Sequence, residues 1–149
     1  MNKLLKPPVR LLLMLALFWA AAGLSEANAQ ENTVKIRMSF NNQEAIIEMF
    51  DNPASHDFLS MLPLTASFDD YARAEKISYL PRKLNTRGSP AASQMQGDFT
   101  YYSPWGNLAV FYKGFGSDGS LYVLGRIISG KGELAGMNKS FTATIERLE

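Results

Sequence analysis

The amino-acid sequence predicts a mainly β fold: a closed or nearly closed antiparallel barrel of seven or eight short strands with one short capping helix. Three observations carry this prediction. Apolar and polar residues alternate with the period of a strand in several short segments, turn-forming residues separate these segments, and one segment has helical spacing. A closed barrel is expected because closure leaves no exposed strand edge.

The first two strands are predicted to form a hairpin. In residues 33–40 the apolar side chains fall on one face and the polar ones on the other, as in a half-buried strand. Asn41 and Asn42 favour a turn, and residues 44–50 have the composition of a returning strand. This order of strand, two-residue turn and strand is typical of a hairpin.

A helix is expected next, over residues 54–62. Asn52 can cap the first turn with its side chain, and Pro53 suits the first helical position. Apolar residues at helical spacing follow, and Pro63 is expected to end the helix.

The remaining strands are separated by clear turn and loop signals. Residues 85–97 have no apolar periodicity and predict a polar loop, the Ser103-Pro104-Trp105-Gly106 segment predicts a β-turn, and residues 113–120 predict a glycine-containing loop. Gly130-Lys131-Gly132 is expected to end the strand predicted at residues 121–128. Residues 65–68 are expected to lead into an extended stretch, and further strands are expected at residues 77–80, 99–102, 108–112, 121–128 and 141–146.

Residues 1–29 have the pattern of a secretory signal peptide. A basic segment precedes twelve unbroken apolar residues (11–22), and Ala27-Asn28-Ala29 is a small-x-small cleavage site. Twelve apolar residues are too few to span a bilayer, which needs about 20, although an uncleaved anchor is the alternative. We expect cleavage after Ala29, a mature domain of residues 30–149 without a stable membrane anchor, and a periplasmic or secreted location.

The composition excludes several classes of function. The chain has no cysteine and one histidine, His56, so we expect no disulfide scaffold, thiol nucleophile, metal site or cofactor. Removing residues 1–29 changes the 15 basic and 14 acidic residues to 12 and 13, a net charge of −1. Nucleic acid is therefore not an expected partner, because no large basic patch remains.

Two segments resemble the compact bacterial and archaeal cyclophilin-like domain family: residues 80–84 (LPRKL) and residues 97–108 (GDFTYYSPWGNL). Other segments are similar to true cyclophilins. Residues 52–58 resemble the start of their first helix, Arg87-Gly88-Ser89-Pro90 followed by residues 96–100 resembles their active-site stretch, and residues 118–126 resemble their Asp-Gly and Val-Phe-Gly-Lys segment. The resemblance covers essentially the whole mature chain and implies a cyclophilin-like β-barrel.

The resemblance also implies site residues. Arg87 stands where true cyclophilins place their catalytic arginine. Met95 takes the position of their carbonyl-binding glutamine in a gapless register, so Gln94 or Gln96 would serve only after a one-residue shift. The positions of the other pocket side chains, two phenylalanines, a tryptophan and a histidine, match Ala92, Val110 or Phe111, Gly116 and Leu121.

Two functions remain open at this point. Prolyl isomerisation needs no metal, nucleophile or general base, because its barrier of ~18–20 kcal/mol comes from C–N double-bond character. The alternative function is therefore a weak peptidyl-prolyl cis-trans isomerase that uses Arg87. The favoured function is a binding module that holds an extended or proline-containing peptide, or a small ligand, in a groove near Arg87, Tyr102 and Trp105. Its further candidate residues are Gln94, Gln96 and Phe111. Simpler roles are core and turn packing for the aromatic residues and a solvated side chain for Arg87.

Overall fold

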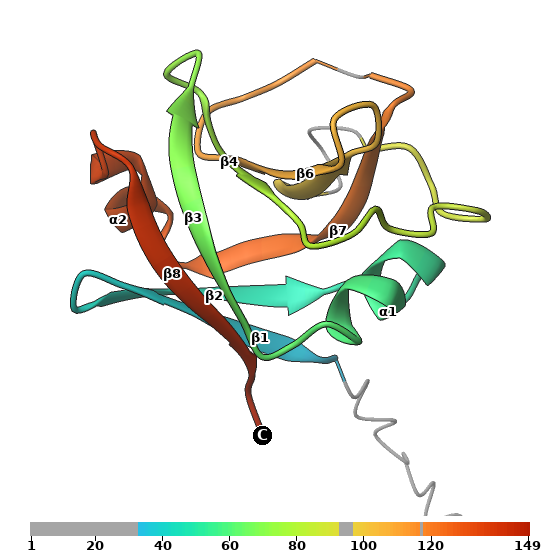
Figure 1. Ribbon diagram of the computed structural model, residues 1–149, viewed down its shortest axis with the longest axis horizontal. Coiled ribbons are helices and arrows are strands. Elements are labelled where there is room, and N and C mark those ends of the chain that lie inside the picture. The colour runs from blue at the N-terminus through green and yellow to red at the C-terminus, as the bar shows by residue number, and fades with distance from the viewer. Residues whose placement is uncertain (1–32, 93–96, 117) are drawn as a thin grey trace, which may run out of the picture. The chain divides into compact units, whose positions relative to one another are not determined.

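The computed structural model describes residues 33–92, 97–116 and 118–149. They form a closed, eight-stranded antiparallel barrel with two short helices (Figure 1). The predicted signal segment and Gln94, Met95 and Gln96 lie outside the described residues. Within the described part of the chain, no helix combines the length and apolar character needed to cross a membrane.

The barrel confirms the predicted fold class. The order of strands around it is β1-β2-β7-β5-β6-β4-β3-β8, and β8 pairs with β1 to close it. All strand pairs are antiparallel. The strands are β1 (Lys35–Phe40), β2 (Gln43–Met49), β3 (Leu64–Tyr71), β4 (Glu75–Tyr79), β5 (Phe99–Tyr102), β6 (Asn107–Phe111), β7 (Leu121–Ser129) and β8 (Phe141–Arg147).

The helix α1 (Pro53–Leu59) begins where the sequence predicts it. The Asn52 side chain accepts a hydrogen bond from the Ser55 amide at 3.0 Å, and Pro53 occupies the first turn. The helix ends at Leu59, earlier than the predicted Leu62. Pro63 explains the difference, because its ring would clash with the carbonyl of the residue four positions earlier in a continued helix.

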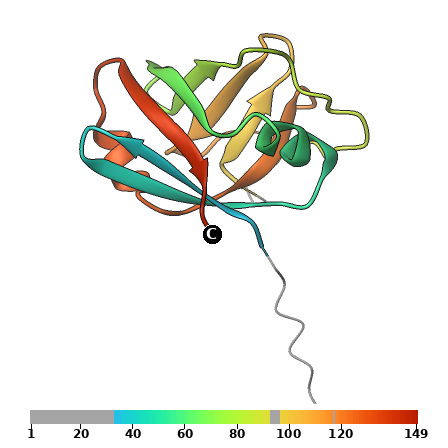
Figure 2. The ribbon, with the colours of Figure 1, turned by 60° about the horizontal axis from the view of Figure 1, so that its bottom comes forward.

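The helix α2 (Lys131–Gly136) corrects the prediction of a single helix. Gly130, expected only to break the strand, adopts φ +84° and precedes the first turn of α2. A Cβ at this position would lie 2.2 Å from the Glu44 carbonyl oxygen, so glycine is required there. The sequence does not reveal α2, because only Leu134 is buried in six residues that include two glycines. The two helices lie at opposite ends of the barrel (Figures 1 and 2).

Alternate residues of the strands fill the barrel interior. Phe58 of α1 packs edge-on against Phe99 of β5, with 5.5 Å between ring centroids. Tyr101 is also buried, and its hydroxyl accepts a hydrogen bond from the Leu84 amide at 3.1 Å. Every strand except β4 contributes buried side chains to this core. The described strands therefore enclose one common hydrophobic core.

A buried lysine lies inside the barrel on β4. The Lys76 ammonium donates a hydrogen bond to the Asp70 carboxylate at 2.7 Å and another to the Met137 carbonyl. The Tyr112 hydroxyl donates to the same carboxylate at 2.6 Å, and its ring lies 4.8 Å from the ammonium. These partners compensate the buried charge. They also hold the pKa of Asp70 below its usual value, Lys76 having the larger effect.

Candidate functional site

A second apolar cluster covers the outer face of the wall formed by β7, β5 and β6. The strand register explains it, since Thr100 of β5 pairs with Ala109 on one side and Val123 on the other, and directly paired residues face the same side of a sheet. We call this group the outer cluster. Its buried members are Ala92, Ala109, Phe111, Leu121 and Val123, and its partly buried members are Phe50, Tyr102 and Phe115.

The outer cluster brings together three residues that match cyclophilin pocket positions: Ala92, Phe111 and Leu121. The Ala92 amide donates a hydrogen bond to the Leu121 carbonyl at 2.7 Å. Phe115 stacks on Phe111 with 4.1 Å between ring centroids. Phe111 is consequently 7% exposed, so its ring contacts the protein itself and offers little surface to a ligand.

Tyr102 and Trp105, both predicted binding residues, contact each other. Their ring centroids lie 5.5 Å apart and their planes meet at 85°. Tyr71, at the end of β3, contacts the same Trp105 ring at 5.7 Å and 88°. Trp105 is 47% exposed and Tyr71 is 43% exposed. We call Tyr71, Tyr102 and Trp105 the Trp105 cluster.

Sequence reasoning missed Tyr71, because it expected an extended stretch from residues 65–68 onward but singled out no side chain in it. The register of β3 with β4 pairs Tyr71 with Glu75, and that of β4 with β6 pairs Glu75 with Phe111. Phe111 belongs to the outer cluster, so Tyr71 lies on the outer face. Only the strand pairing reveals this placement.

The turn between β5 and β6 holds Trp105 in place. The Gly106 amide donates a hydrogen bond to the Tyr102 carbonyl at 2.9 Å, and the Gly106 carbonyl accepts one from the Leu80 amide at 3.3 Å. Gly106 has φ +73°, a conformation that favours glycine. Both backbone polar groups of Gly106, the residue that follows Trp105, are thus held by hydrogen bonds.

Glu75 lies on the same outer face, between Tyr71 and Phe111 in the strand register. Burial raises the pKa of its carboxyl group to about 7. Among the described residues, no hydrogen bond or ion pair engages this carboxyl group. It is therefore an uncompensated acid beside aromatic rings.

Arg87 lies apart from the Trp105 cluster in its contacts. Its amide donates a hydrogen bond to the Asn85 side chain at 3.1 Å, and its exposed side chain has no hydrogen bond or ion pair within the described ranges. Nor does any described contact join Arg87 to Tyr102, Trp105 or Phe111. The structure thus brings together Tyr102 and Trp105 but not Arg87.

The loop that carries Arg87 is fastened to α1. Arg82 makes a two-point interaction with the Asp57 carboxylate, at 2.8 and 2.7 Å, and the Asn85 amide donates to the same carboxylate at 2.7 Å. The hydrogen bonds from Arg82 hold the pKa of Asp57 below its usual value. Further along, the Ser89 hydroxyl accepts a hydrogen bond from the Ala54 amide at 2.9 Å. The loop is therefore positioned by contacts with both Ala54 and Asp57 of α1.

A cavity of about 540 Å³ borders this loop. Gly88 and Pro90 line it from the loop, whereas Arg87 between them does not. The Arg126 guanidinium, also in the lining, lies 5.5 Å from the centroid of the Phe50 ring. The other lining residues are Asp51, Asn52, Pro53 and Val123.

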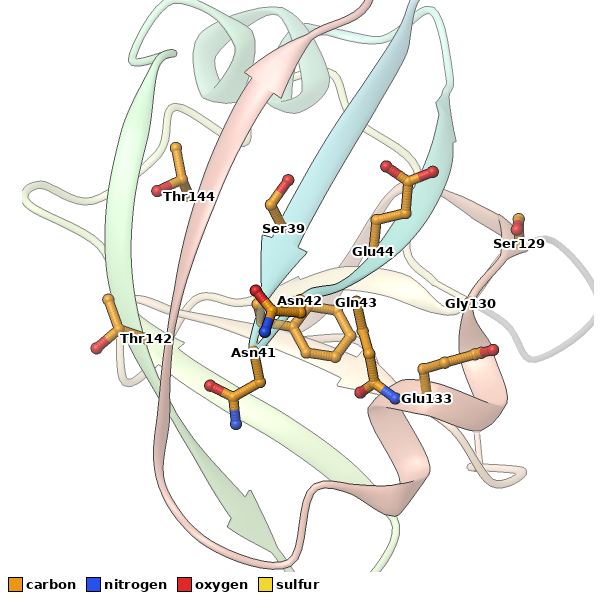
Figure 3. Close-up of a pocket in the computed structure, with 11 residues that line it drawn as sticks. Ser39, Asn41, Asn42, Gln43, Glu44, Ser129, Gly130, Glu133, Thr142 and Thr144 are labelled. Atoms are coloured by element: carbon orange, nitrogen blue, oxygen red, sulfur yellow. The ribbon is translucent and has the colours of Figure 1, made fainter.

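A larger cavity of about 740 Å³ lies at the β1–β2 turn, near α2 and β8 (Figure 3). Its lining is mainly polar, and Glu44 in it is already paired with Arg37 at 3.1 Å. It contains none of the residues that the cyclophilin resemblance implies. In the described part of the chain, no three His, Asp or Glu side chains gather in a way that could hold a metal ion.

Comparison with known proteins decides the family. A model of the cyclophilin-like family matches residues 38–146. The chain belongs to the cyclophilin-like family. This match extends from β1 to β8 and confirms the resemblance seen in the sequence. No match was found among the curated proteins.

One solved structure shows the same fold for this cyclophilin-like domain. The solution structure of the hypothetical protein AF2241 from Archaeoglobus fulgidus superimposes with a TM-score of 0.56 at 17% sequence identity. The alignment covers 78% of this chain and 95% of that chain. At this identity the likeness concerns the fold alone.

Proposed function

We propose that this cyclophilin-like domain is an exported binding module that holds an extended, proline-containing peptide against the Trp105 cluster. The observation that carries the proposal is the packing of Tyr71 and Tyr102 nearly perpendicular to Trp105, which remains 47% exposed. Proline-rich segments bind to surfaces lined with aromatic rings, because their preformed extended helix loses little entropy on binding.

The distribution of exposed apolar side chains supports this location. The described residues include five exposed large hydrophobic side chains, and three of them, Tyr71, Tyr79 and Trp105, belong to the outer face of the β3–β4–β6 wall or its adjoining turn. A concentration of exposed rings on one face is typical of an interaction surface. Rigid aromatic side chains also lose little conformational entropy when they contact a partner.

An extended peptide suits the site better than an enclosed small ligand. Three residues that match cyclophilin pocket positions, Ala92, Phe111 and Leu121, lie in the outer cluster, where Phe115 covers Phe111. The exposed rings of the Trp105 cluster instead lie on an open face. Small ligands prefer concave sites that bury most of their surface.

The sequence of residues 1–29 supports export, through its basic segment, apolar run and cleavage site. Mass spectrometry of the protein recovered from the periplasm or the medium tests this part of the proposal. A mature chain that begins at Gln30 is the expected result, and a full-length chain confined to the cytoplasm would contradict it.

Peptide binding can be tested with residues 30–149, in which Trp105 is the sole tryptophan. A proline-rich peptide is expected to shift the Trp105 emission, whereas the same peptide with alanine in place of proline is not. Calorimetry should show that Trp105→Ala abolishes binding. The control Ile128→Ala removes a side chain that is also 47% exposed, and it should bind normally. Equal binding by the two variants would contradict the proposed site.

A weak prolyl isomerase that uses Arg87 is the second candidate. The observation in its favour is the exposed Arg87 guanidinium, which has no ion-pair partner among the described residues and lies in a loop that borders a cavity of about 540 Å³. A guanidinium could donate a hydrogen bond to the prolyl nitrogen as the amide twists. An isomerisation assay of residues 30–149 beside Arg87→Ala tests it. Acceleration that disappears in the variant supports this function, and an unchanged rate contradicts it.

A further inference from the structure

We propose that Glu75 and the Trp105 cluster form a subsite for an alkylammonium group, such as a lysine side chain of the bound peptide. This inference rests on the proposed function for the peptide, and it adds the chemistry of the side chain that the site selects. An ammonium group is attracted to the faces of aromatic rings by their quadrupole, and tryptophan has the strongest effect.

The ring geometry suits such a cation. Tyr71 and Tyr102 stand at 88° and 85° to Trp105, with centroids at 5.7 and 5.5 Å. Trp105 and Tyr71 also remain 47% and 43% exposed, so part of each ring is accessible to a cation. Aromatic cages for methylated ammonium groups use the same physical interaction.

Glu75 supplies a negative charge beside Tyr71, one ring of the Trp105 cluster. It pairs directly with Tyr71 in the strand register, and directly paired residues have Cβ atoms ~4.5–5.5 Å apart. No cation engages its carboxylate among the described residues, although the group is partly buried. An alkylammonium ligand would therefore supply the counter-charge that the protein lacks here.

The basic residues around Glu75 contact other parts of the molecule. Lys76 faces the interior and binds Asp70. Arg73 and Lys113 line a different cavity of about 520 Å³, together with Asp70 and residues near α2. The Lys83 side chain contacts the Gly106 turn beside Trp105, and it makes no ion pair with Glu75 among the described residues. None of them pairs with Glu75 in the described part of the chain.

A second acidic residue on the outer face, Asp69, adds to the negative potential around Glu75 and Tyr71. Asp69 of β3 is two residues from Tyr71 and shares its face, as the pairing of Asp69 with Ile77 shows. Its carboxylate accepts a hydrogen bond from the Ser140 hydroxyl. The charged side chains that β3 and β4 present on this face are thus acidic, which favours a cationic ligand group.

The acid–base behaviour of Glu75 gives the subsite a pH dependence. Burial raises its pKa to about 7, so part of the population is uncharged near neutral pH. A bound ammonium favours the carboxylate and lowers this pKa. Affinity for the cation should therefore rise as pH increases from about 6 to about 8, while affinity for a neutral analogue should not.

The test compares three versions of one proline-containing peptide, with lysine, trimethyllysine or uncharged norleucine at a single position. Trp105 emission in residues 30–149 reports binding. Both cationic peptides are expected to bind about tenfold more tightly than the norleucine peptide at pH 8. Glu75→Gln should reduce this ratio severalfold and remove its pH dependence, and Tyr71→Leu should reduce it because leucine has no π face.

Two matched variants serve as controls. Glu133→Gln makes the same chemical change on an exposed residue of α2, and Tyr79→Leu replaces an exposed tyrosine that has no ring contact among the described residues. Both should keep the cation preference. Thermal unfolding confirms that each variant is folded.

The outcomes separate this inference from the proposed function. Equal affinity for the lysine and norleucine peptides overturns the inference and leaves the peptide-binding function in place. If no peptide binds, free trimethyllysine is titrated into residues 30–149, and sodium chloride at equal ionic strength is the control. A saturable shift of Trp105 emission then supports the subsite while the peptide function fails, and no shift overturns both.

Discussion

The Tyr71 ring lies at 88° to the Trp105 ring, with 5.7 Å between their centroids, although one ends β3 and the other belongs to the turn between β5 and β6. The strand order β5-β6-β4-β3 brings the two segments to one face of the barrel. The pair therefore depends on the folded barrel rather than on local sequence.

Removing one ring of this pair should expose the other. Tyr71→Ala is expected to increase the quenching of Trp105 fluorescence by acrylamide and to lower the free energy of unfolding by about 0.5–1.5 kcal/mol. Quenching and urea unfolding of residues 30–149 measure both effects. Tyr79→Ala, which removes a ring without an aromatic contact in the described residues, should change neither quantity. Unaltered quenching in Tyr71→Ala would contradict the contact.

Glu75 should make the protein less stable as pH rises. Its pKa is raised from 4.5 to about 7 by burial, so the folded state binds the proton more tightly than the unfolded state. Its stabilising contribution is present below about pH 4.5 and is lost as pH rises through about 7. Relative to Glu75→Gln, the wild type should lose on the order of 1–2 kcal/mol between pH 5 and pH 8, allowing for partial solvent screening. Parallel unfolding curves of the two proteins across this range would refute it.

The Asp57 carboxylate should stabilise the loop that carries Arg87. The Arg82 guanidinium lowers the pKa of Asp57, so this contribution is present above pH 3.8 and is lost as pH falls through the lower folded value. We expect Asp57→Asn to lower stability at neutral pH and to speed hydrogen exchange at the Asn85 amide. Asp51→Asn, at a carboxylate that is 94% exposed, is the control. Exchange at Asn85 that stays slow would show that the loop is held by other contacts.

Phe115 should act as a cover for the outer cluster. Phe115→Ala removes the ring that stacks on Phe111 at 4.1 Å. Because Phe115 is partly exposed, the expected cost is about 1–2 kcal/mol, less than the ~3–5 kcal/mol of a fully buried phenylalanine. Binding of a fluorescent apolar dye should increase as Phe111 becomes accessible. A dye signal equal to that of the wild type would show that Phe115 does not cover Phe111.

Gly125 of β7 should tolerate no side chain. A Cβ there would lie 2.4 Å from the Glu48 carbonyl oxygen on the neighbouring strand, so Gly125→Ala must displace backbone. The expected loss of stability is about 1–3 kcal/mol. Gly132→Ala in α2 is the contrasting variant, because a Cβ there meets nothing within 4 Å. It should raise stability by about 0.5–1 kcal/mol, and a similar loss in both variants would contradict the difference in space.

Local patterns in the sequence account for most of the barrel. The alternation in residues 33–40 and the paired Asn41 and Asn42 predict the first hairpin, which the structure confirms with φ values of 45° and 60° at the two asparagines. Asn52 and Pro53 likewise predict the start of α1. These features depend on neighbours in sequence, and a single chain displays them directly.

Features that depend on distant contacts escaped prediction. The helix α2 is held by one buried side chain, Leu134, and by the close approach of Gly130 to β2. Tyr71 joins Trp105 only through the order of the strands. Resemblance grouped Arg87 with Tyr102 and Trp105, yet no described contact unites them. Sequence position alone does not report which side chains share a face.

The most direct test of the account is the affinity of residues 30–149 for a proline-rich peptide, measured by Trp105 emission and by calorimetry with Trp105→Ala and Ile128→Ala. Saturable binding that Trp105→Ala abolishes and Ile128→Ala preserves is the predicted result. Binding that survives in Trp105→Ala would place the partner elsewhere on the barrel and contradict the proposed site.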